Sequence, residues 1–500
     1  MAILGIDLGT TNSLMSIFDD SGIAKIVHNK EGRNLTPSVA WIQDKDKKSI
    51  KVGDEAKNVI GQEHNVYFEF KREMGKSTRY PFFDVDISAT ELSAFVLQKL
   101  KKDFEAMHGD VETVVITVPA NFANEQREAT LAAAKIAGFK TQLLINEPTA
   151  AALHYAYSDS EDDNGTYMVF DFGGGTFDVS IVKVNGSNVE VVGSDGLQKC
   201  GGADLDKAVL KVISMKFNEE CNAELDLSKS NFSISNAEEI KISLSSLNEK
   251  KVSIISEGYP KKTFTITRNE FEAEIGGILT QMRMVCENIL VDCNLDTSQI
   301  KEIFLAGGSS RIPCVQSMLE DFFGRKPKLK GNPDEAISLG AALYAGIKSD
   351  KSKLKTPQKD LVAKLSLQEV SPAYFGMISL NDSKLVNSVL IKKNEKIPCS
   401  VTESFYTVTD DQDSVNLRIT QSPVDENDPR FVRTIWEGSL SVPKGRPAGQ
   451  EVKVTYAYQE NGLMSATFID ISSGQQQAVD ITAQSEGAKS DININDFIVD

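Results

Sequence analysis

The chain of 500 residues is too long for a single hydrophobic core and predicts two to four domains. Hydrophobic residues make up 41% and charged residues 25%, which is typical of a globular protein in water. The net charge of −17, with no basic stripe to offset it, argues against a nucleic-acid partner.

The N-terminal residues and the reactive side chains narrow the class further. The opening MAILGIDLG has neither the basic flank nor the long apolar run of a signal peptide or membrane span, so we expect a cytoplasmic protein with no membrane partner. The six cysteines form no CxxC pair, which favours free, buried thiols. Only four histidines occur, and they are scattered, so we expect neither a histidine-based metal site nor a catalytic triad.

One short motif occurs twice. Residues 5–17 read GIDLGTTNSLMSI and residues 169–181 read VFDFGGGTFDVSI, so that Asp7 aligns with Asp171. Each copy has an apolar run, an Asp, glycine with Thr, and a second β-rich run, which predicts a strand–turn–strand hairpin. Glycine N–H groups approach a bound anion closely, and the Asp could hold a divalent cation that bridges phosphates. One copy alone is as consistent with an ordinary turn, but two matched copies predict two half-domains that clamp one polyphosphate.

Strand-like and helix-like stretches alternate up to about residue 348. The stretch SATELSAFVLQKLKKDFEAM begins with a Ser88–Glu91 capping box, and NEQREATLAAAKIAG closes on Gly138, so both predict helices. TVVITVP (113–119) and EIFLAGG (302–308) are short and apolar, as buried parallel strands are. This alternation predicts an α/β fold.

The composition then changes. KSDKSKLKTPQKD (348–360) is polar and lysine-rich, which predicts a linker or a frayed helix end. From about residue 371 the hydrophobic pattern has period two, with an Asn461-Gly462 hairpin turn, which predicts an all-β module. The expected divisions are an α/β domain at 1–350, a linker at 351–370, the β module at 371–485 and a short acidic tail at 486–500.

Further stretches combine glycine with acidic or hydroxyl side chains. They are CGGADLD (200–206), AEEIKISLSS (237–246), LAGGSSRIP (305–313) and NPDEAISLGAALYAG (332–346). Arg311 offers a guanidinium plane on which a base can stack, and Glu238, Lys241 and Ser245 fall on one face of a predicted helix. Each stretch alone is more often structural than functional, and only their order along one chain favours a site.

Taken in order, GIDLGTTNS, INEPTAAA (145–152), DFGGGTFDVS (171–180), GGADLD, GGSSRIP and NPDEA resemble the 70-kDa heat-shock chaperones of the DnaK type. The resemblance extends from residue 3 to about 485. The wider actin and sugar-kinase superfamily shares the paired hairpins but not INEPTAAA or a β module after the ATPase. The resemblance implies an α/β, two-lobed actin-like ATPase domain, with ATP or ADP between its lobes, followed by an all-β sandwich domain.

The resemblance also implies which residues hold the phosphates and Mg²⁺. Asp7, Asp171 and Asp178 would hold the metal mainly through water, and Lys71 and Glu147 would act on the terminal phosphate together with Asp171 and Thr176. Without the resemblance, Lys71 would be interpreted as a solvated surface lysine. Phosphoryl transfer needs mainly positioning and charge neutralisation, which this set would supply. The implied phosphate contacts are Gly9, Thr10, Thr11 and Asn12 in the first hairpin and Gly173, Gly174, Gly175 and Thr176 in the second.

For the adenosine, the resemblance implies a set of residues from the second half of the domain. One position departs from the family, because many relatives carry an adenine-packing arginine where this chain has Ile242. Stacking on the base would then fall to Arg311 and to apolar contacts. The implied set is Gly201, Gly202, Glu238, Lys241, Ser245, Gly307, Gly308, Ser309, Arg311 and Asp334.

Two smaller groups concern communication and peptide binding. Pro119 and Arg127, in VPANFANEQR, match the family's interdomain switch. The alternative interpretation is a proline that ends a strand and an arginine on the surface of a helix. In the β module, four residues would line a pocket for an apolar side chain of an extended peptide, where a structural core is an equally consistent interpretation. These four are Met377, Phe405, Val415 and Leu417.

The implied partners are unfolded or extended polypeptides, a nucleotide exchange factor and a J-domain co-chaperone. Leu143 stands where the family usually has an arginine that engages J-domains, and KLSLQEVSP (364–372) dilutes the usual leucine-rich linker. The 486–500 tail stands where relatives carry a helical lid.

We therefore expect a lidless, ATP-hydrolysing chaperone that binds extended apolar peptides under control of its ATPase cycle. The alternative is a dedicated adaptor that holds one specific protein partner, with nucleotide as a switch and little turnover. Lys71, Glu147 and Thr176 favour turnover, whereas Leu143 and the diluted linker favour the adaptor. A sugar or acetate kinase is a distant third hypothesis, since it would leave the β module without a role.

Overall fold

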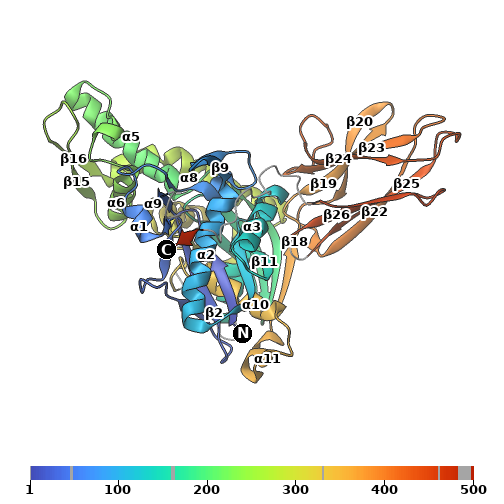
Figure 1. Ribbon diagram of the computed structural model, residues 1–500, viewed down its shortest axis with the longest axis horizontal. Coiled ribbons are helices and arrows are strands. Elements are labelled where there is room, and N and C mark those ends of the chain that lie inside the picture. The colour runs from blue at the N-terminus through green and yellow to red at the C-terminus, as the bar shows by residue number, and fades with distance from the viewer. Residues whose placement is uncertain (1, 45–48, 159–163, 329–330, 460–461, 482–496) are drawn as a thin grey trace.

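The computed structural model describes residues 2–44, 49–158, 164–328, 331–459, 462–481 and 497–500. An α/β body with two lobes occupies one side of the molecule, and an all-β module projects from the other (Figure 1). This is the predicted fold. Asn461 of the predicted Asn461-Gly462 turn lies outside the described residues, as do residues 482–496, which include the end of the expected β module and most of the expected tail.

The first lobe is built on a mixed sheet in the order β11-β10-β1-β2-β3, with β4 paired to β2. β1 runs antiparallel to β2 and parallel to β10, so the first motif forms the predicted hairpin. Apolar side chains fill both faces of β1 because helices cover the sheet. The strands are β1 (Ala2–Asp7), β2 (Asn12–Phe18), β3 (Ala24–Val27), β4 (Leu35–Pro37), β10 (Val111–Val118) and β11 (Thr141–Asn146).

The outer part of this lobe carries a second sheet in the order β28-β6-β5-β7 and a β8-β9 hairpin. Helix α2 begins where the capping box predicts, because the Ser88 N–H donates to Glu91 Oε2 at 2.7 Å. Helix α3 ends before Gly138, whose φ of +84° is the left-handed conformation that glycine tolerates. The elements are β5 (Ala40–Asp44), β6 (Ser49–Val52), α1 (Asp54–Asn58), β7 (Val66–Tyr67), η1 (Phe70–Glu73), β8 (Arg79–Phe82), β9 (Val85–Ser88), α2 (Ala89–His108), α3 (Asn124–Ile136) and β28 (Ile498–Val499).

The second lobe repeats the plan of the first. Its sheet runs β17-β12-β13-β14-β18-β21, with β12 antiparallel to β13 and parallel to β17, as β1 is to β2 and β10. The strands are β12 (Gly165–Phe172), β13 (Phe177–Asn185), β14 (Asn188–Leu197), β15 (Glu249–Ile254), β16 (Lys262–Thr267), β17 (Ile300–Ala306), β18 (Ser366–Val370) and β21 (Lys396–Ile397). The helices are α5 (Gly202–Cys221), η2 (Leu227–Lys229), α6 (Ile234–Leu244), α7 (Arg268–Glu274), α8 (Gly276–Asp292), η3 (Thr297–Gln299), η4 (Gly308–Arg311) and α9 (Pro313–Phe323).

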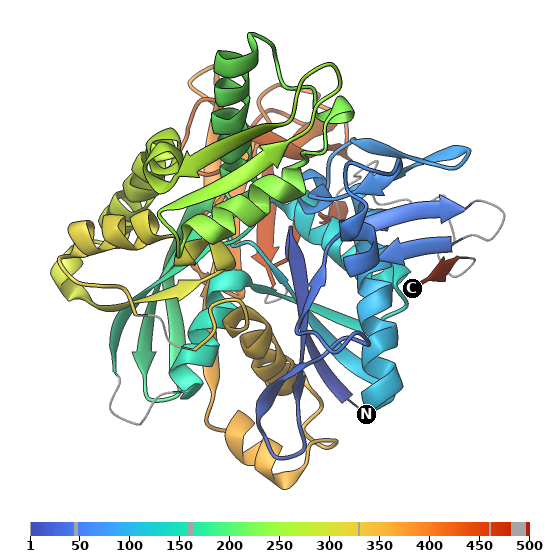
Figure 2. The same cartoon turned by 90° about the vertical axis from the view of Figure 1, so that its left-hand side faces the viewer.

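Helices α4 (Glu147–Ser158) and α10 (Ala336–Lys348) join the lobes at their base (Figure 2). Both helices contribute to a core that also contains β1, β12 and β13 side chains. They cross with backbone in contact, because a Cβ at Gly340 would overlap the Ala150 carbonyl oxygen. The alanine-rich segment INEPTAAA therefore forms a closely packed contact between the helices beneath the cleft.

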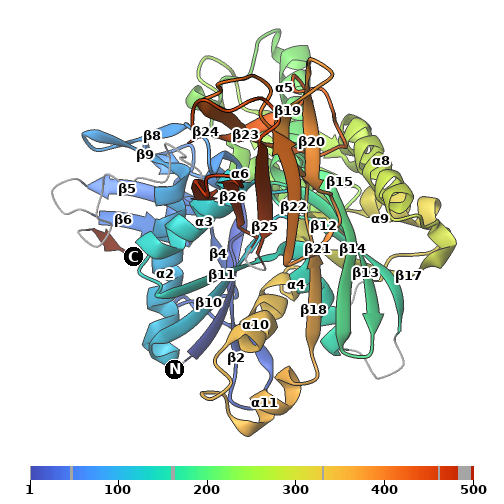
Figure 3. The same ribbon diagram turned by 90° about the vertical axis from the view of Figure 1, so that its right-hand side faces the viewer.

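The expected linker is more ordered than its composition suggests. Residues after α10 form helix α11 (Thr356–Val362), and Leu354, Val362 and Leu365 are buried in the core beneath the lobes. β18 then pairs in parallel with β14 and antiparallel with β21, so one strand belongs to the sheet of the second lobe and also reaches the β module (Figure 3). This packing is possible because apolar residues recur among the lysines at the spacing typical of a strand or of a helix.

The β module consists of two four-stranded antiparallel sheets, β20-β19-β23-β24 and β22-β25-β26-β27. Inward-facing side chains of both sheets form one core. The strands are β19 (Tyr374–Asn381), β20 (Lys384–Ile391), β22 (Cys399–Tyr406), β23 (Ser414–Ser422), β24 (Arg433–Ser441), β25 (Glu451–Tyr458), β26 (Met464–Asp470) and β27 (Gln476–Asp480).

Two sequence-wide expectations can be compared with the structure. All six cysteines are free, as predicted, but only Cys200 and Cys286 are buried, and the other four are partly exposed. Among the residues that the structure describes, none of the helices combines the length and apolar character needed to cross a membrane.

Candidate nucleotide site

The tips of the two repeated hairpins face each other across the cleft between the lobes. A Cβ added at Gly174 would overlap Thr11 Oγ1, and one at Gly175 would overlap Thr10 Oγ1. Glycine at these positions is therefore required by the close approach of the two turns. The repeated motif thus gives two loops that approach one point from opposite lobes.

A cavity of about 360 Å³ lies behind these tips, a size suited to a small-molecule ligand. Its lining combines polar groups of both hairpins with apolar side chains of the inner lobes, which include Leu14, Leu35 and Ile337. Two predicted site residues, Gly201 and Asp178, are not among its lining. The predicted residues that line it are Asp7, Gly9, Thr10, Thr11, Asn12, Lys71, Glu147, Asp171, Gly173, Gly174, Gly175, Thr176, Gly202, Glu238, Lys241, Ser245, Gly307, Gly308, Ser309, Arg311 and Asp334.

The floor of the cavity is strongly acidic. Asp7, Glu147 and Asp171 are buried there around the buried ammonium group of Lys71, and Asp178 is buried beside Asp171 on the neighbouring strand. Lys71 Nζ donates to Glu147 Oε1 at 2.6 Å, so the interpretation of Lys71 as a solvated surface lysine is wrong. The η1 turn carries this lysine inward from the first lobe, and Glu147 begins α4 at the end of β11.

The crowding of carboxylates perturbs their ionisation. Burial, followed by repulsion from Glu147, raises the pKa of Asp7 to about 7 and the pKa of Asp178 to about 7. The same two causes raise the pKa of Asp171 well above its usual range. Each group would regain its ordinary acidity if positive charge entered the site.

Two oxygens on this floor have no protein partner. Asp171 Oδ2 and Asp178 Oδ2 are buried without a hydrogen bond, whereas Asp7 Oδ1 accepts from Thr117 Oγ1 at 2.8 Å. In the described parts of the chain, no cluster of three or more His, Cys, Asp or Glu side chains is placed to hold a metal ion directly. Unpaired carboxylate oxygens with raised pKa values nevertheless fit a hydrated divalent cation, which prefers oxygen ligands.

The other end of the cavity is formed by the second lobe. Lys241, in α6, donates to the Gly202 carbonyl at 3.1 Å and pairs with Asp206 at 2.7 Å. Burial raises the pKa of Asp206 to about 6 despite this lysine. Gly201 lies behind the lining, where a Cβ would clash with the backbone of Gly174.

Arg311 and Ile242 form the exposed rim of this end. The Arg311 guanidinium pairs with Asp334 at 2.9 Å, which holds it beside the opening. Ile242 lines the cavity with its side chain 60% exposed, so its apolar surface faces the position predicted for the base.

Side chains that the sequence did not single out join the two lobes across the cleft. Arg72, next to Lys71, pairs with Asp204 of the second lobe, and Lys57 of α1 pairs with Glu238 at 2.7 Å. Arg72 directly follows Lys71, and Asp204 lies in GGADLD. Both residues therefore stand in stretches that the sequence already assigned to the site. Nothing in the local sequence around Lys57 indicated its partner.

One of the two predicted switch residues, Arg127, has contacts that connect the cleft to the linker. Pro119 follows β10, and Arg127 in α3 is buried, so the interpretation of Arg127 as a helix-surface residue is wrong. Arg127 donates to Asn146 Oδ1 at 2.7 Å, and Asn146 donates to Glu369 of β18 at 3.2 Å. Asn146 is the residue before Glu147, so the chain of contacts extends from the acidic floor to the linker strand.

The four predicted peptide-pocket residues belong to the core of the β module. Met377 and Leu417 are buried, at 4% and 0% exposed, while Phe405 and Val415 are partly exposed at the edge of the core. Phe405 lies in β22 and the other three in the opposite sheet. Their role in peptide binding stays a prediction, as does the weak J-domain contact inferred from Leu143, which packs against the core beneath the lobes.

Comparison with known proteins bears on this arrangement. A family model described as Hsp70 protein matches residues 3–90 and 82–498. The mitochondrial heat shock 70 kDa protein of Pisum sativum is 32% identical over 533 aligned residues, which cover 99% of this chain and 75% of that protein. The expected cytoplasmic location stays a prediction, since the name of this relative places it in mitochondria.

Proposed function

The chain belongs to the Hsp70 family of ATPases and ATP-dependent chaperones, and from this premise we propose that it hydrolyses ATP in the cleft between its lobes and thereby controls the binding of extended apolar polypeptide by its β module. The observation that carries this proposal is the convergence of both hairpin tips, Lys71 and the three buried carboxylates Asp7, Glu147 and Asp171 on one cavity.

The phosphates would be bound by the two hairpin tips. Thr10, Thr11 and Thr176 line the same cavity, and their backbone N–H and hydroxyl groups are the kind of donor that phosphates need. Asp7, Asp171 and Asp178 would hold Mg²⁺ largely through its water. When bound, Mg²⁺ neutralises phosphate charge. The unpaired oxygens of Asp171 and Asp178 support this assignment.

Lys71 and Glu147 would act on the transferring group. The buried ammonium of Lys71 stabilises the negative charge on the terminal phosphate, and the site excludes water that would weaken this attraction. Glu147 holds the lysine in place through a hydrogen bond of 2.6 Å. Its carboxylate would orient the attacking water together with Thr176 of the second hairpin.

The adenosine would occupy the second-lobe end of the cavity. Gly202, Ser245 and Gly308 leave room there, Lys241 and Glu238 offer polar contacts, and Arg311 offers a planar surface for the base. Ile242 supplies an apolar contact where many relatives are expected to stack an arginine.

Contacts between the body and the β module support coupling of the two sites. β18 joins the two parts, and ion pairs reinforce the contact: Arg433 with Glu125 at 2.8 Å, and Lys396 with Glu190 at 2.7 Å. Because Asn146 contacts both Arg127 and Glu369, a change at the acidic floor has a short route to the linker strand. The partners of such a cycle would be unfolded polypeptides, a nucleotide exchange factor and a J-domain co-chaperone.

The test is whether an unfolded model polypeptide raises the steady-state rate of ATP hydrolysis by the full chain. Stimulation that is lost in Glu369→Ala, but kept in Glu437→Ala at an exposed position of β24, would support coupled chaperone activity. Hydrolysis that does not respond to several unrelated unfolded polypeptides would favour the alternative of a dedicated adaptor that holds one specific partner with little turnover.

A further inference from the structure

The last described segment of the chain, Phe497–Asp500, lies on the first lobe of the ATPase body rather than on the β module (Figure 3). β28 pairs in parallel with β6, with Ile498 opposite Ser49 and Val499 opposite Ile50. The Asp500 N–H donates to the Ile50 carbonyl at 3.1 Å, and the Val52 N–H donates to the Asp500 carbonyl at 2.8 Å. The segment therefore adds one strand to the free edge of the outer sheet.

The side chains of the segment alternate between the lobe and solvent. The Phe497 ring lies 5.0 Å from the Phe82 ring, edge to face, and 6.3 Å from the Phe95 ring. Val499 is 2% exposed within the core of the lobe, whereas Ile498 between them is 56% exposed. This inward, outward, inward pattern is that of a strand seated on a preformed apolar surface.

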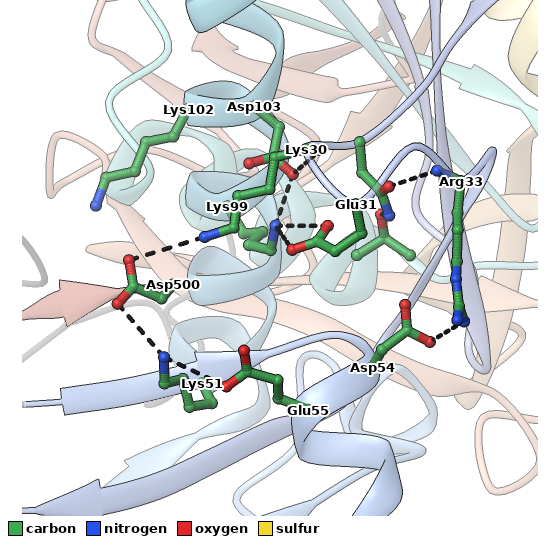
Figure 4. A network of polar contacts seen from close by, with 12 residues as sticks. Lys30, Glu31, Arg33, Lys51, Asp54, Glu55, Lys99, Lys102, Asp103 and Asp500 are labelled. Atoms are coloured by element: carbon green, nitrogen blue, oxygen red, sulfur yellow. Dashed lines mark hydrogen bonds and ion pairs between the residues drawn. The ribbon is translucent and has the colours of Figure 1, made fainter.

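Basic side chains surround the acidic end of the segment (Figure 4). The Asp500 carboxylate lies 3.5 Å from Lys51 Nζ and 4.0 Å from Lys30 Nζ, and Lys102 Nζ donates to the Val499 carbonyl at 3.3 Å. The neighbouring Lys99 is already paired with Glu31 and Asp103. On a chain of net charge −17, three lysines around one short acidic segment are a local exception.

We propose that this corner of the first lobe is a second peptide-binding site, distinct from the pocket expected in the β module, and that its occupant is the chain's own segment Phe497–Asp500. We call it the tail groove and define it by the edge of β6, the aromatic side chains Phe82, Phe83 and Phe95, and Lys30, Lys51 and Lys102. It binds by strand addition: main-chain hydrogen bonds hold the segment, and alternate side chains select it. Its recognition pattern is aromatic, unrestricted, aliphatic and acidic in that order.

Occupation of the tail groove ties the end of the β module to the ATPase lobe, in addition to the connection through β18. Val52, whose N–H donates to the Asp500 carbonyl, is followed by Gly53, the N-cap residue of α1. α1 carries Lys57, the residue that pairs with Glu238 across the cleft. The segment is thus connected through β6 to the helix that pairs with the second lobe across the cleft.

Amide hydrogen exchange of the full chain tests the docking directly. Phe497→Asp places a carboxylate against the aromatic side chains and should accelerate exchange of the Val52 N–H at least tenfold. Ile498→Asp adds the same charge on the exposed face and should leave that exchange unchanged. Exchange in β12 of the second lobe should be the same in both variants, which controls for folding. Equal exchange at Val52 in both variants would overturn the proposal.

Binding in trans tests the recognition pattern. The probe is a fluorescent peptide with the sequence of residues 494–500, INDFIVD, and the readout is its anisotropy. The Phe497→Asp chain, with its groove vacated, should bind the probe at least tenfold more tightly than the parent, whose own segment competes at high effective concentration. Adding Lys51→Glu in the groove should abolish the gain, and adding Lys25→Glu on β3 should not. Binding that survives Lys51→Glu would assign the peptide to the β module and overturn the proposal.

Discussion

Lys71 Nζ and Glu147 Oε1 lie 2.6 Å apart at the floor of the cleft, and both side chains are buried. Seventy-six positions separate the two residues in the chain. Each compensates the other's charge, and within the described residues Asp7, Asp171 and Asp178 form no ion pair. These uncompensated buried carboxylates favour a ligand that brings positive charge.

Removal of the lysine should separate binding from cleavage. Lys71→Ala should bind ATP nearly as the parent does and should hydrolyse it about 10²–10³-fold more slowly, because the ammonium acts on charge that develops at the terminal phosphate. Single-turnover hydrolysis of radiolabelled ATP measures the step. Lys76→Ala, which removes a partly exposed lysine paired with Glu73, is the matched control. A parent-like cleavage rate in Lys71→Ala would disprove the assignment.

The close approach of the hairpin tips should be sensitive to a single methyl group. Gly175→Ala would place a Cβ against Thr10 Oγ1, and forcing such an overlap typically costs about 1–3 kcal/mol. We expect nucleotide affinity to fall by roughly that amount, measured by titration calorimetry. Gly277→Ala in α8 has open space around the new Cβ and should bind nucleotide as the parent does. Equal affinities for the two variants would contradict the packing of the tips.

Binding of Mg·ADP near pH 7 should release protons. Because the pKa values of Asp7 and Asp178 are raised to about 7, each carboxyl is about half protonated there in the free protein. A bound cation lowers both pKa values, so about one proton should leave from these two carboxyls on binding, with fewer at higher pH, and protonated Asp171 would add to that number. Calorimetric titrations in two buffers of different ionisation enthalpy give the number. Uptake of protons would show that no cation is bound at these carboxylates.

The ion pair across the cleft should slow nucleotide release. Lys57→Ala removes the partner of Glu238, and a partly exposed pair is worth about 0.2–1 kcal/mol, so ADP should leave up to about fivefold faster. Stopped-flow release of a fluorescent ADP measures this. Lys25→Ala, which breaks the exposed pair with Asp19, serves as the control, and the effect of Lys57→Ala should shrink in high salt.

Docking of the linker strand should depend on pH through Glu369. Burial is the main cause that raises the pKa of this carboxyl in the docked arrangement, and the undocked linker would return it to its ordinary value. The docked state therefore binds the proton more tightly, and docking should be strongest at mildly acidic pH and weaken as pH rises through the raised pKa. Limited proteolysis across residues 348–370, at several pH values with ATP and with ADP, reports docking. Glu369→Gln should remain docked with this pH dependence removed; an unchanged pH profile would show that other groups are responsible.

Much of the architecture was determined by contiguous residues. The repeated GIDLGTTNS and VFDFGGGT runs each carry their own strand, turn and strand. The Ser88 capping box sets the start of α2, and Gly138 sets the end of α3. The residues after 371, whose hydrophobic pattern has period two, form the strands of the β module. Such signals are local, because backbone conformation and hydrophobic periodicity are set by neighbours a few positions apart. The order of the motifs also sufficed to predict the family.

Only the tertiary structure decided which distant residues meet. Without the family resemblance, Lys71 and Arg127 would be interpreted as surface residues. In the fold they are buried, in contact with Glu147 and Asn146. The lysine-rich stretch after α10 forms a packed helix and a strand of the sheet because Leu354, Val362 and Leu365 are buried in the core beneath the lobes. The segment Phe497–Asp500 is too short to predict a strand, and it forms one because the edge of β6, some 450 positions away, offers unpaired backbone groups and an apolar surface. A sequence fixes the donors and side chains of each element, but their partners depend on where the whole chain brings them.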